Sequence, residues 1–296
     1  MAHQHTSARV RADPRGMNAN DWIFTPEDIR ASPSAREGMA YRAEIEQRSK
    51  GANFIIQVGM KLRLPQMTLN VATTLFHRFY MRFSLKRYHH YEIGATCLFL
   101  AVKTEETGRK LQDIVVACCR VARKDDKLLV DEQSKDFWRW KDVILFREEL
   151  LLEALCFDLY LENPFDLLNR YMRTFSLANT EGLSKSACAF INDSCRTTLC
   201  LQHPPKVIAA AALHCAITMN PNSKIPPEPG TGRQWYDQVG VSMDEITSAC
   251  GIITEVYDTR PKPDAAKGDK TEKVAKGEPK PDAPRPDRAE RPDADK

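Results

Sequence analysis

CLFLAVKTEE, residues 97–106, is the stretch that most clearly indicates the fold of this chain. It continues an uncharged, largely apolar run that begins at Ile93, and it ends with Lys103, Glu105 and Glu106. Such a run can be buried on every side of a helix, so it predicts the central helix of a helical core. Its end raises the question of what a lysine and two carboxylates do at the tip of a buried helix.

The composition is that of a globular protein, with 296 residues, 42% hydrophobic, 28% charged and a net charge of +3. This small charge gives no electrostatic signature of nucleic-acid binding. No segment is apolar enough to span a membrane, and the N-terminus has no apolar signal stretch. The nine cysteines lie mostly in apolar helical patterns, as reduced buried thiols do. We therefore expect a soluble cytosolic or nuclear protein without membrane or direct nucleic-acid partners.

Apolar residues recur at spacings of three and four along most of the chain, which predicts an all-α fold. The Asn163–Pro164 pair is a helix-start signal that separates two series of segments. We predict an N-terminal lobe of about five helices with a preceding helical arm (21–162) and a C-terminal lobe of about five helices (163–258). Residues 1–20 and the charged, proline-rich tail 259–296 are predicted to be disordered. The periodic segments are 54–64, 69–81, 93–102, 111–121 and 143–155, then 165–175, 183–201, 207–219 and 243–257.

The segment WIFTPEDIRASPS predicts a short N-terminal helical arm. Thr25 suits the N-cap, Pro26 the first helical position, and Asp28 the reciprocal position of a capping box. Trp22 and Phe24 precede this cap and are placed to dock the arm on an apolar surface. That surface is either the arm's own lobe or another molecule, and the sequence leaves both interpretations open.

Motifs for catalysis are missing from the sequence. It contains no dinucleotide-binding, P-loop, zinc-protease or nucleophile-elbow pattern. Cys195, Cys200 and His203 form a weak zinc candidate, which buried structural cysteines explain better. The acids of 122–135 resemble a magnesium cluster, but interleaved lysines favour a solvated connector. The side chains of the adjacent His89–His90 pair are predicted to point apart on a helix, which makes them a poor metal site. From all these observations we expect no cofactor, no metal and no enzyme activity.

Glu148 is an anomaly because a carboxylate in an apolar stripe is unfavourable unless it is paired or hydrogen-bonded. Its helical neighbours at three and four residues are all apolar: Ile144, Leu145, Leu151 and Leu152. In one interpretation Glu148 protrudes at the edge of a packed face, while Lys103 pairs with Glu106 one turn away. In the other, Lys103 and Glu148 belong to an apolar surface that docks a partner.

Four segments in order resemble the cyclin K, T and L group of transcriptional cyclins. They are WIFTPEDIRASPS, HRFYMRFSLKRYHHYEIGATCLFLAVKTEE, LLLEALCFDLYLENPFDLL and FINDSCRTTLCLQHPPKVIAAAAL, within residues 22–257. The segment RKDDKLLVDEQSKDFWRWKD, together with NDSC, is most similar to the fungal cyclin subunit of the kinase that phosphorylates the RNA polymerase II C-terminal domain. The resemblance implies two tandem five-helix cyclin boxes, matching the two helical series.

The resemblance also implies a function. The chain would be a non-catalytic subunit in the nucleus that binds and activates a cyclin-dependent kinase and promotes transcription elongation. Its partner would be that kinase, with the polymerase C-terminal domain contacted indirectly, and the sequence leaves open whether a third subunit joins the complex. The alternative is a cyclin-fold core that binds DNA, as in a general transcription factor. That family usually carries a zinc ribbon and strongly basic lobes, which this sequence lacks.

In the cyclin family, a lysine at the end of the third helix and a glutamate on the fifth contact the kinase backbone. These positions correspond to Lys103 and Glu148. Mitotic cyclins dock substrates on MRAILVDW in the first helix; the matching QRSKGANF keeps Arg48 but loses most of that apolar face. The family aspartate that pairs with this arginine is replaced by His77, so neither substrate docking nor that salt bridge is expected. The predicted kinase-binding residues are Lys103, Glu148, Glu106, Phe99, Leu151 and Leu152.

Overall fold

Helices make up all the regular structure in the described part of the chain. The computed structural model describes residues 22–180, 182–220, 225, 227 and 230–258. Within these ranges there is no strand, and no helix is long and apolar enough to cross a membrane. The all-α prediction is therefore confirmed. The two tails predicted to be disordered, 1–20 and 259–296, lie outside the described residues.

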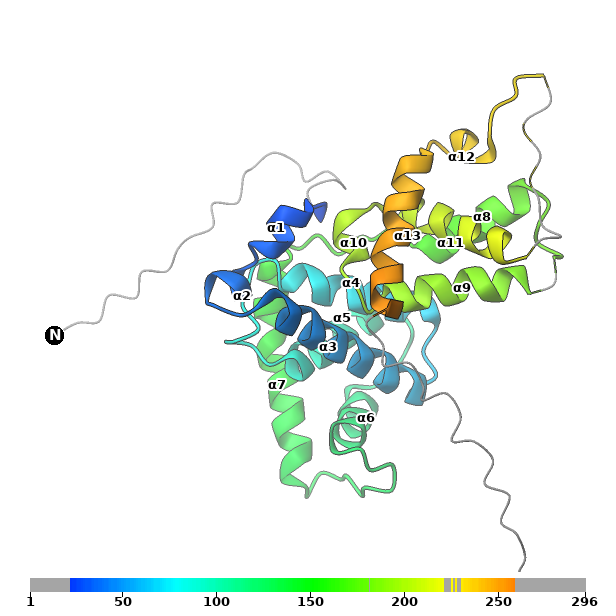
Figure 1. Cartoon of the computed structure of the whole chain (residues 1–296). Helices are drawn as coiled ribbons and strands as arrows, with labels where there is room; N and C mark the ends of the chain where they lie inside the picture. The colour runs from blue at the N-terminus through cyan, green and yellow to red at the C-terminus, as the bar shows by residue number, and fades with distance from the viewer. Residues whose placement is uncertain (1–21, 181, 221–224, 226, 228–229, 259–296) are drawn as a thin grey trace, which may run out of the picture. The chain divides into compact units, whose positions relative to one another are not determined.

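Five helices form a first bundle around one central helix (Figure 1). They are α3 (Tyr41–Lys61), α4 (Gln66–Phe79), α5 (His90–Thr104), α6 (Leu111–Arg123) and α7 (Lys135–Ala154). The uncharged helix α5 packs against each of the other four, as its sequence predicts. Gly51 lets α3 approach α4 closely, because a Cβ there would lie 2.2 Å from the ring of Phe76.

A second set of five helices also packs around a central helix, α11. It consists of α8 (Pro164–Thr174), α9 (Leu183–Ser194), α11 (Pro205–Met219), α12 (Trp235–Gln238) and α13 (Met243–Asp258), with the short α10 (Leu199–Gln202) between α9 and α11. Helix α11 packs against α8, α9 and α13, and its buried Ala209–Ala212 run allows close approach. The predicted two-bundle fold is confirmed. The apolar side chains form two separate clusters. The first ends at Leu161, and the second contains residues from Phe165 onward together with Met67 of the first bundle. These clusters support our proposal that the bundles divide at 162–163.

One predicted helix is interrupted. The apolar spacing predicted a continuous helix over 183–201, but α9 ends at Ser194 and α10 begins at Leu199. The Ser194 hydroxyl donates to the carbonyl of Ile191 at 2.7 Å, and the Thr197 hydroxyl donates to the carbonyl of Ser194 at 2.8 Å. These side chains compete with the regular backbone bonds, which apolar periodicity does not reveal.

The N-terminal arm consists of two short helices, α1 (Pro26–Arg30) and α2 (Pro33–Arg36). The predicted capping box at the start of α1 is present, with Thr25 and Asp28 satisfying each other's backbone N–H groups. Ser32 caps α2 by accepting a hydrogen bond from the N–H of the third residue of that helix.

Trp22 and Phe24 attach this arm to the rest of the same chain. The indole of Trp22 is 1% exposed, and its Nε1 donates to Oδ2 of Asp158 at 2.8 Å. The guanidinium of Arg78 lies 4.8 Å from the centre of the Trp22 ring. The N–H of Phe24 donates to the carbonyl of Leu201 at 2.7 Å. Of the two interpretations left open, the structure supports docking on the protein itself.

A buried polar network anchors the first turns of α3. Glu44 accepts from the Ser32 hydroxyl at 2.5 Å and from Nε of Arg48 at 2.8 Å. Arg48 also donates to the carbonyls of His77 at 3.0 Å and Tyr80 at 2.9 Å. The carboxylate partner of Arg48 is thus Glu44, one turn earlier on the same helix. The charges compensate each other where both side chains are almost inaccessible to water.

Candidate partner-binding surface

The charged tip of α5 results from the way this helix ends. Lys103 lies in the last turn, where a positive charge is favourable beside the helix C-terminus. Glu105 is the C-cap, and Glu106 has a left-handed φ of 50°. The N–H of Thr107 closes the turn by donating to the carbonyl of Val102 at 3.2 Å. The chain therefore leaves the core after Val102 and exposes the residues that follow.

Glu148 lies at the boundary between the buried and exposed faces of α7. Ile144 and Leu151 are fully buried, Leu145 is 45% exposed, and Leu152 is half-buried. The side chain of Glu148 itself is 17% exposed. Of the predicted contact residues on this helix, Leu152 borders the surface with Glu148. Leu151 packs inside the core, so we leave it out of the proposed surface.

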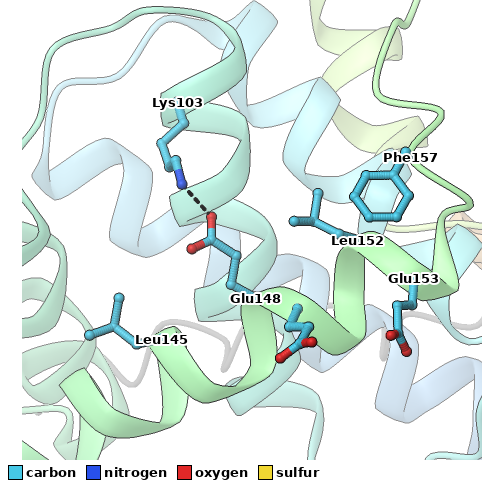
Figure 2. Close-up of a pocket in the computed structure, with 7 residues that line it drawn as sticks. Lys103, Leu145, Glu148, Leu152, Glu153 and Phe157 are labelled. Atoms are coloured by element: carbon cyan, nitrogen blue, oxygen red, sulfur yellow. Dashed lines mark hydrogen bonds and ion pairs between the residues drawn. The ribbon is translucent and has the colours of Figure 1, made fainter.

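Lys103 and Glu148 form a direct ion pair. Nζ of Lys103 lies 2.5 Å from Oε1 of Glu148 (Figure 2). The lysine side chain is 51% exposed, and its ammonium lies 5.1 Å from the ring centre of the half-buried Phe99. The local alternative had Lys103 paired with Glu106; the structure pairs it with Glu148 instead. Glu106, three residues after Lys103, is exposed.

An open groove of about 380 Å³ surrounds the ion pair. Its floor and rim combine apolar side chains with one cation and three carboxylates (Figure 2). The excess of negative charge favours a binding segment that presents backbone N–H groups or basic side chains. We call this surface the α7 groove, and it is lined by Lys103, Leu145, Glu148, Glu149, Leu152, Glu153 and Phe157.

Phe157 is held at the rim of the α7 groove by an unusual turn. Cys156 and Phe157 both adopt left-handed backbone conformations, with φ of 52° and 58°. The N–H of Phe157 donates to the carbonyl of Leu152 at 3.0 Å and closes the end of α7. A left-handed conformation costs a non-glycine residue roughly 1–2 kcal/mol. This turn leaves the aromatic ring 67% exposed.

Large exposed apolar side chains are frequent in residues 145–160, the stretch that supplies most of the groove. Besides Leu145 and Phe157, the neighbouring Phe146 is 78% exposed and Tyr160 is 90% exposed. Single exposed apolar side chains are common, but several within one short stretch indicate a surface that another molecule covers. The sequence did not single out Phe157, Glu149 or Glu153 as members of this surface.

The residues considered as metal ligands have other environments. Within the described ranges, no group of three or more histidine, cysteine, aspartate or glutamate side chains is placed to hold a metal ion. Cys195 is buried, and Asp126 pairs with Lys61 at 2.5 Å. The prediction that His89 and His90 point apart is wrong, because their rings stack with centres 4.4 Å apart. His89 is the N-cap of α5, so its side chain does not follow helical spacing.

Comparisons with known proteins identify one recurrent similarity. The profile described as "Cyclin, N-terminal domain" matches residues 27–160, which contain the whole α7 groove. Cyclin pch1 of Schizosaccharomyces pombe is 45% identical over 244 residues, covering 82% of this chain and 71% of that protein. Human Cyclin-K is 35% identical over 80% of this chain and 40% of its own length. Rice Cyclin-T1-1 is 31% identical over 81% of this chain and 53% of its own.

Solved structures share the fold at low sequence identity. A chain in the crystal structure of the yeast RNA Pol II CTD kinase CTDK-1 complex matches with a TM-score of 0.66 and 19% identity. The match covers 80% of this chain and 73% of that one. A chain of the yeast TFIIK (Kin28/Ccl1/Tfb3) complex matches with a TM-score of 0.58 and 18% identity, over 78% and 96% of the two chains. At these identities the likeness concerns the fold alone.

Proposed function

This chain belongs to the cyclin family, and we propose that it is the non-catalytic regulatory subunit of a cyclin-dependent kinase that it binds through the α7 groove. The observation that carries this proposal is the Lys103–Glu148 ion pair within a cluster of exposed apolar side chains. The groove lies within the segment that matches the family profile. The contact residues we propose are Lys103, Glu148, Glu106, Phe99 and Leu152, with Leu145 and Phe157 added from the structure.

The ion pair is suited to a contact with a polypeptide backbone. Each charged group has hydrogen-bonding capacity beyond the single bond between Lys103 and Glu148. A partner that covers Leu145 and Phe157 would exclude water from the pair and strengthen these charged hydrogen bonds. Removing one member would strand the other charge in the interface, at a cost of roughly 2–5 kcal/mol in binding.

Activation then follows from a population shift in the kinase. The cyclin binds the active position of the kinase regulatory helix more tightly than the inactive one, so binding favours the active conformation. ATP, magnesium and the catalytic residues are all supplied by the kinase. The activity gained is limited by the difference in affinity for the two kinase conformations.

The names of similar proteins support a more specific assignment. The structural neighbours include chains from the yeast RNA Pol II CTD kinase CTDK-1 and from yeast TFIIK, a complex of Kin28, Ccl1 and Tfb3. With the similarity to Cyclin-K and Cyclin-T1-1, this supports a kinase that phosphorylates the RNA polymerase II C-terminal domain and promotes elongation. The complex would act in the nucleus and include a third subunit. The DNA-binding alternative has no comparable support, and the net charge of +3 does not favour it.

Affinity purification tests the proposal. The tagged full chain is recovered from cells of its source, and the protein kinase that copurifies is identified by mass spectrometry. The same capture is repeated with Lys103→Glu and Glu148→Lys, and with Lys61→Glu as a matched control. Lys61→Glu also reverses one charge of a 2.5 Å ion pair of the first bundle, Lys61–Asp126, outside the groove.

The two groove variants are expected to lose the kinase while retaining the helical circular dichroism spectrum of the wild type. The Lys61→Glu control is expected to retain the kinase. Capture at the wild-type level by both groove variants would overturn the assignment of the surface. A wild-type chain that recovers no protein kinase would overturn the function itself.

A further inference from the structure

Two cysteines of the second bundle lie next to each other on neighbouring helices. Cys215 is on α11 and Cys250 is on α13, and these helices pack together. Their Sγ atoms are 3.3 Å apart, at hydrogen-bonding distance between two thiols. Both side chains are half-buried and border the apolar core. The pair therefore combines close contact with partial access from solvent.

The pair differs from the other cysteines in its electrostatics. Either sulfur can donate the hydrogen bond between the two thiols, but an ionised Cys250 can only accept it from Cys215, and this bond lowers the pKa of Cys250. The same hydrogen bond and burial raise the pKa of Cys215. Burial instead raises the pKa of Cys97, and it raises that of Cys200 to about 12. Reactive cysteines have a lowered pKa and solvent access, so Cys250 is the favoured nucleophile.

We propose that Cys215 and Cys250 are a reversible oxidation site, which a peroxide converts into an intramolecular disulfide between α11 and α13. The sulfur atoms must approach from 3.3 Å to about 2.05 Å, a movement of about 1.3 Å. This movement is small enough for side-chain adjustment on two helices already in contact. The inference concerns the second bundle and does not depend on the proposed kinase binding.

The reaction has two steps and consumes one peroxide. The Cys250 thiolate attacks one oxygen of hydrogen peroxide; an S–O bond forms, the O–O bond breaks, and hydroxide leaves. The Cys215 sulfur then attacks the sulfenic sulfur of Cys250; the S–S bond forms, and the S–O bond breaks. The Cys215 proton leaves with the departing oxygen as water. The hydroxide of the first step takes up the proton that the Cys250 thiol released on ionising, so two thiols lose two electrons and hydrogen peroxide is reduced to two waters.

The disulfide would fasten the last helix of the second bundle to its central helix. Helix α11 packs against α8, α9, α10 and α13, whereas the main helix contacts of α13 are with α10 and α11. A cross-link between α11 and α13 suppresses opening of α13 and constrains the unfolded chain between the two cysteines. We expect slower amide exchange in α13 and a thermal midpoint raised by roughly 5 °C. A thiol reductant would reverse both effects.

The test uses the folded full-length chain and hydrogen peroxide. After oxidation, the remaining thiols are alkylated, the protein is digested without reduction, and linked peptides are identified by mass spectrometry. Variants Cys215→Ser and Cys250→Ser remove one member of the pair each. Cys188→Ser is the matched control, because Cys188 is also half-buried but lies on α9.

The wild type and Cys188→Ser are expected to yield the Cys215–Cys250 linked peptide, with a mass loss of two hydrogens and a monomer on a non-reducing gel. The serine variants of the pair are expected to yield none and to show no change in thermal midpoint. Dithiothreitol should restore both thiols. Oxidation of Cys250 to sulfinic acid without the link, or links to other cysteines or between chains, would overturn the proposal.

Discussion

Nζ of Lys103 lies 2.5 Å from Oε1 of Glu148, although 45 residues separate the two in sequence. The pair connects the last turn of α5 to the middle of α7, the helix beside it. A partly exposed ion pair contributes about 0–1 kcal/mol to the stability of the fold, because water screens it. The pair therefore contributes little to the stability of the free protein, and contact with a partner explains its presence better.

Exchanging the two charges tests this distinction. The double variant Lys103→Glu/Glu148→Lys restores an ion pair of opposite polarity, so its thermal midpoint should remain close to that of the wild type. Like the single variants, the double variant should fail to bind the kinase, because the kinase groups that contact the pair would meet a reversed pattern of donors and acceptors. Recovery of binding by the double variant, measured by surface plasmon resonance, would mean that the pair acts only inside the cyclin.

Replacing Phe157 by glycine separates binding from folding. Glycine adopts a φ of 58° without strain, and the ring is 67% exposed, so we expect a change in unfolding free energy within about 1 kcal/mol. Loss of the ring should weaken kinase binding at least about tenfold, or about 1.4 kcal/mol. Titration calorimetry and urea unfolding measure the two effects. Leu129→Ala is the control, because Leu129 is 89% exposed outside the groove; equal binding by both variants would contradict the assigned role of Phe157.

The buried network at Glu44 makes a large contribution to stability. Glu44→Gln leaves the guanidinium of Arg48 buried without a counter-ion, which should destabilise the protein by about 3–5 kcal/mol. Glu46→Gln is the matched control on the same helix. It removes an exposed pair with Lys50, also at i,i+4 spacing, and should leave the urea midpoint unchanged. Similar midpoints for both variants would show that the Glu44 network is dispensable.

His77 should make the stability depend on pH. Burial, helped by the nearby charge of Arg48, lowers the pKa of His77 to about 3. The unfolded chain binds this proton below about pH 6.5, whereas the folded protein does not. Stability should therefore fall as the pH drops from 6.5 towards 3, by about 2 kcal/mol at pH 5 from this group.

His77→Gln tests the assignment, because its amide can still donate to the carbonyl of Cys195, which accepts from Nε2 of His77 at 3.0 Å. As the pH falls from 6.5 to 5, the unfolding free energy of the wild type should decrease relative to that of the variant. Parallel pH profiles for the two proteins would exclude a lowered pKa at His77.

The sequence predicted the central helices because α5 and α11 are buried on nearly every side. Their apolar runs leave no alternative orientation to choose between. The Thr25–Asp28 capping box was also predictable, since it depends on neighbours three residues apart. That Lys103 and Glu148 share one surface was one of two interpretations of two charges in apolar surroundings, and the cyclin resemblance favoured it. Neither observation alone brings two separate helices together.

Features that depend on helix rotation and turn geometry were not predictable. Leu151 and Leu152 fit the apolar pattern equally well, and only the packing of α7 decides that Leu151 enters the core. The exposed position of Phe157 requires two consecutive left-handed residues, for which CFD carries no glycine or asparagine signal. The break after Ser194 depends on hydroxyl groups that bond locally to the backbone.

The hydrogen bond from Trp22 to Asp158 has a practical consequence for choosing expression fragments. Asp158 directly follows Phe157, so the indole braces the loop that presents that ring. A fragment cut to the family-profile boundaries, 27–160, would retain every residue of the α7 groove yet lose this brace. Such a fragment would be unsuitable for measuring affinity. Weak binding by it would reflect the loss of support for the Phe157 loop and would not show that the partner is wrong.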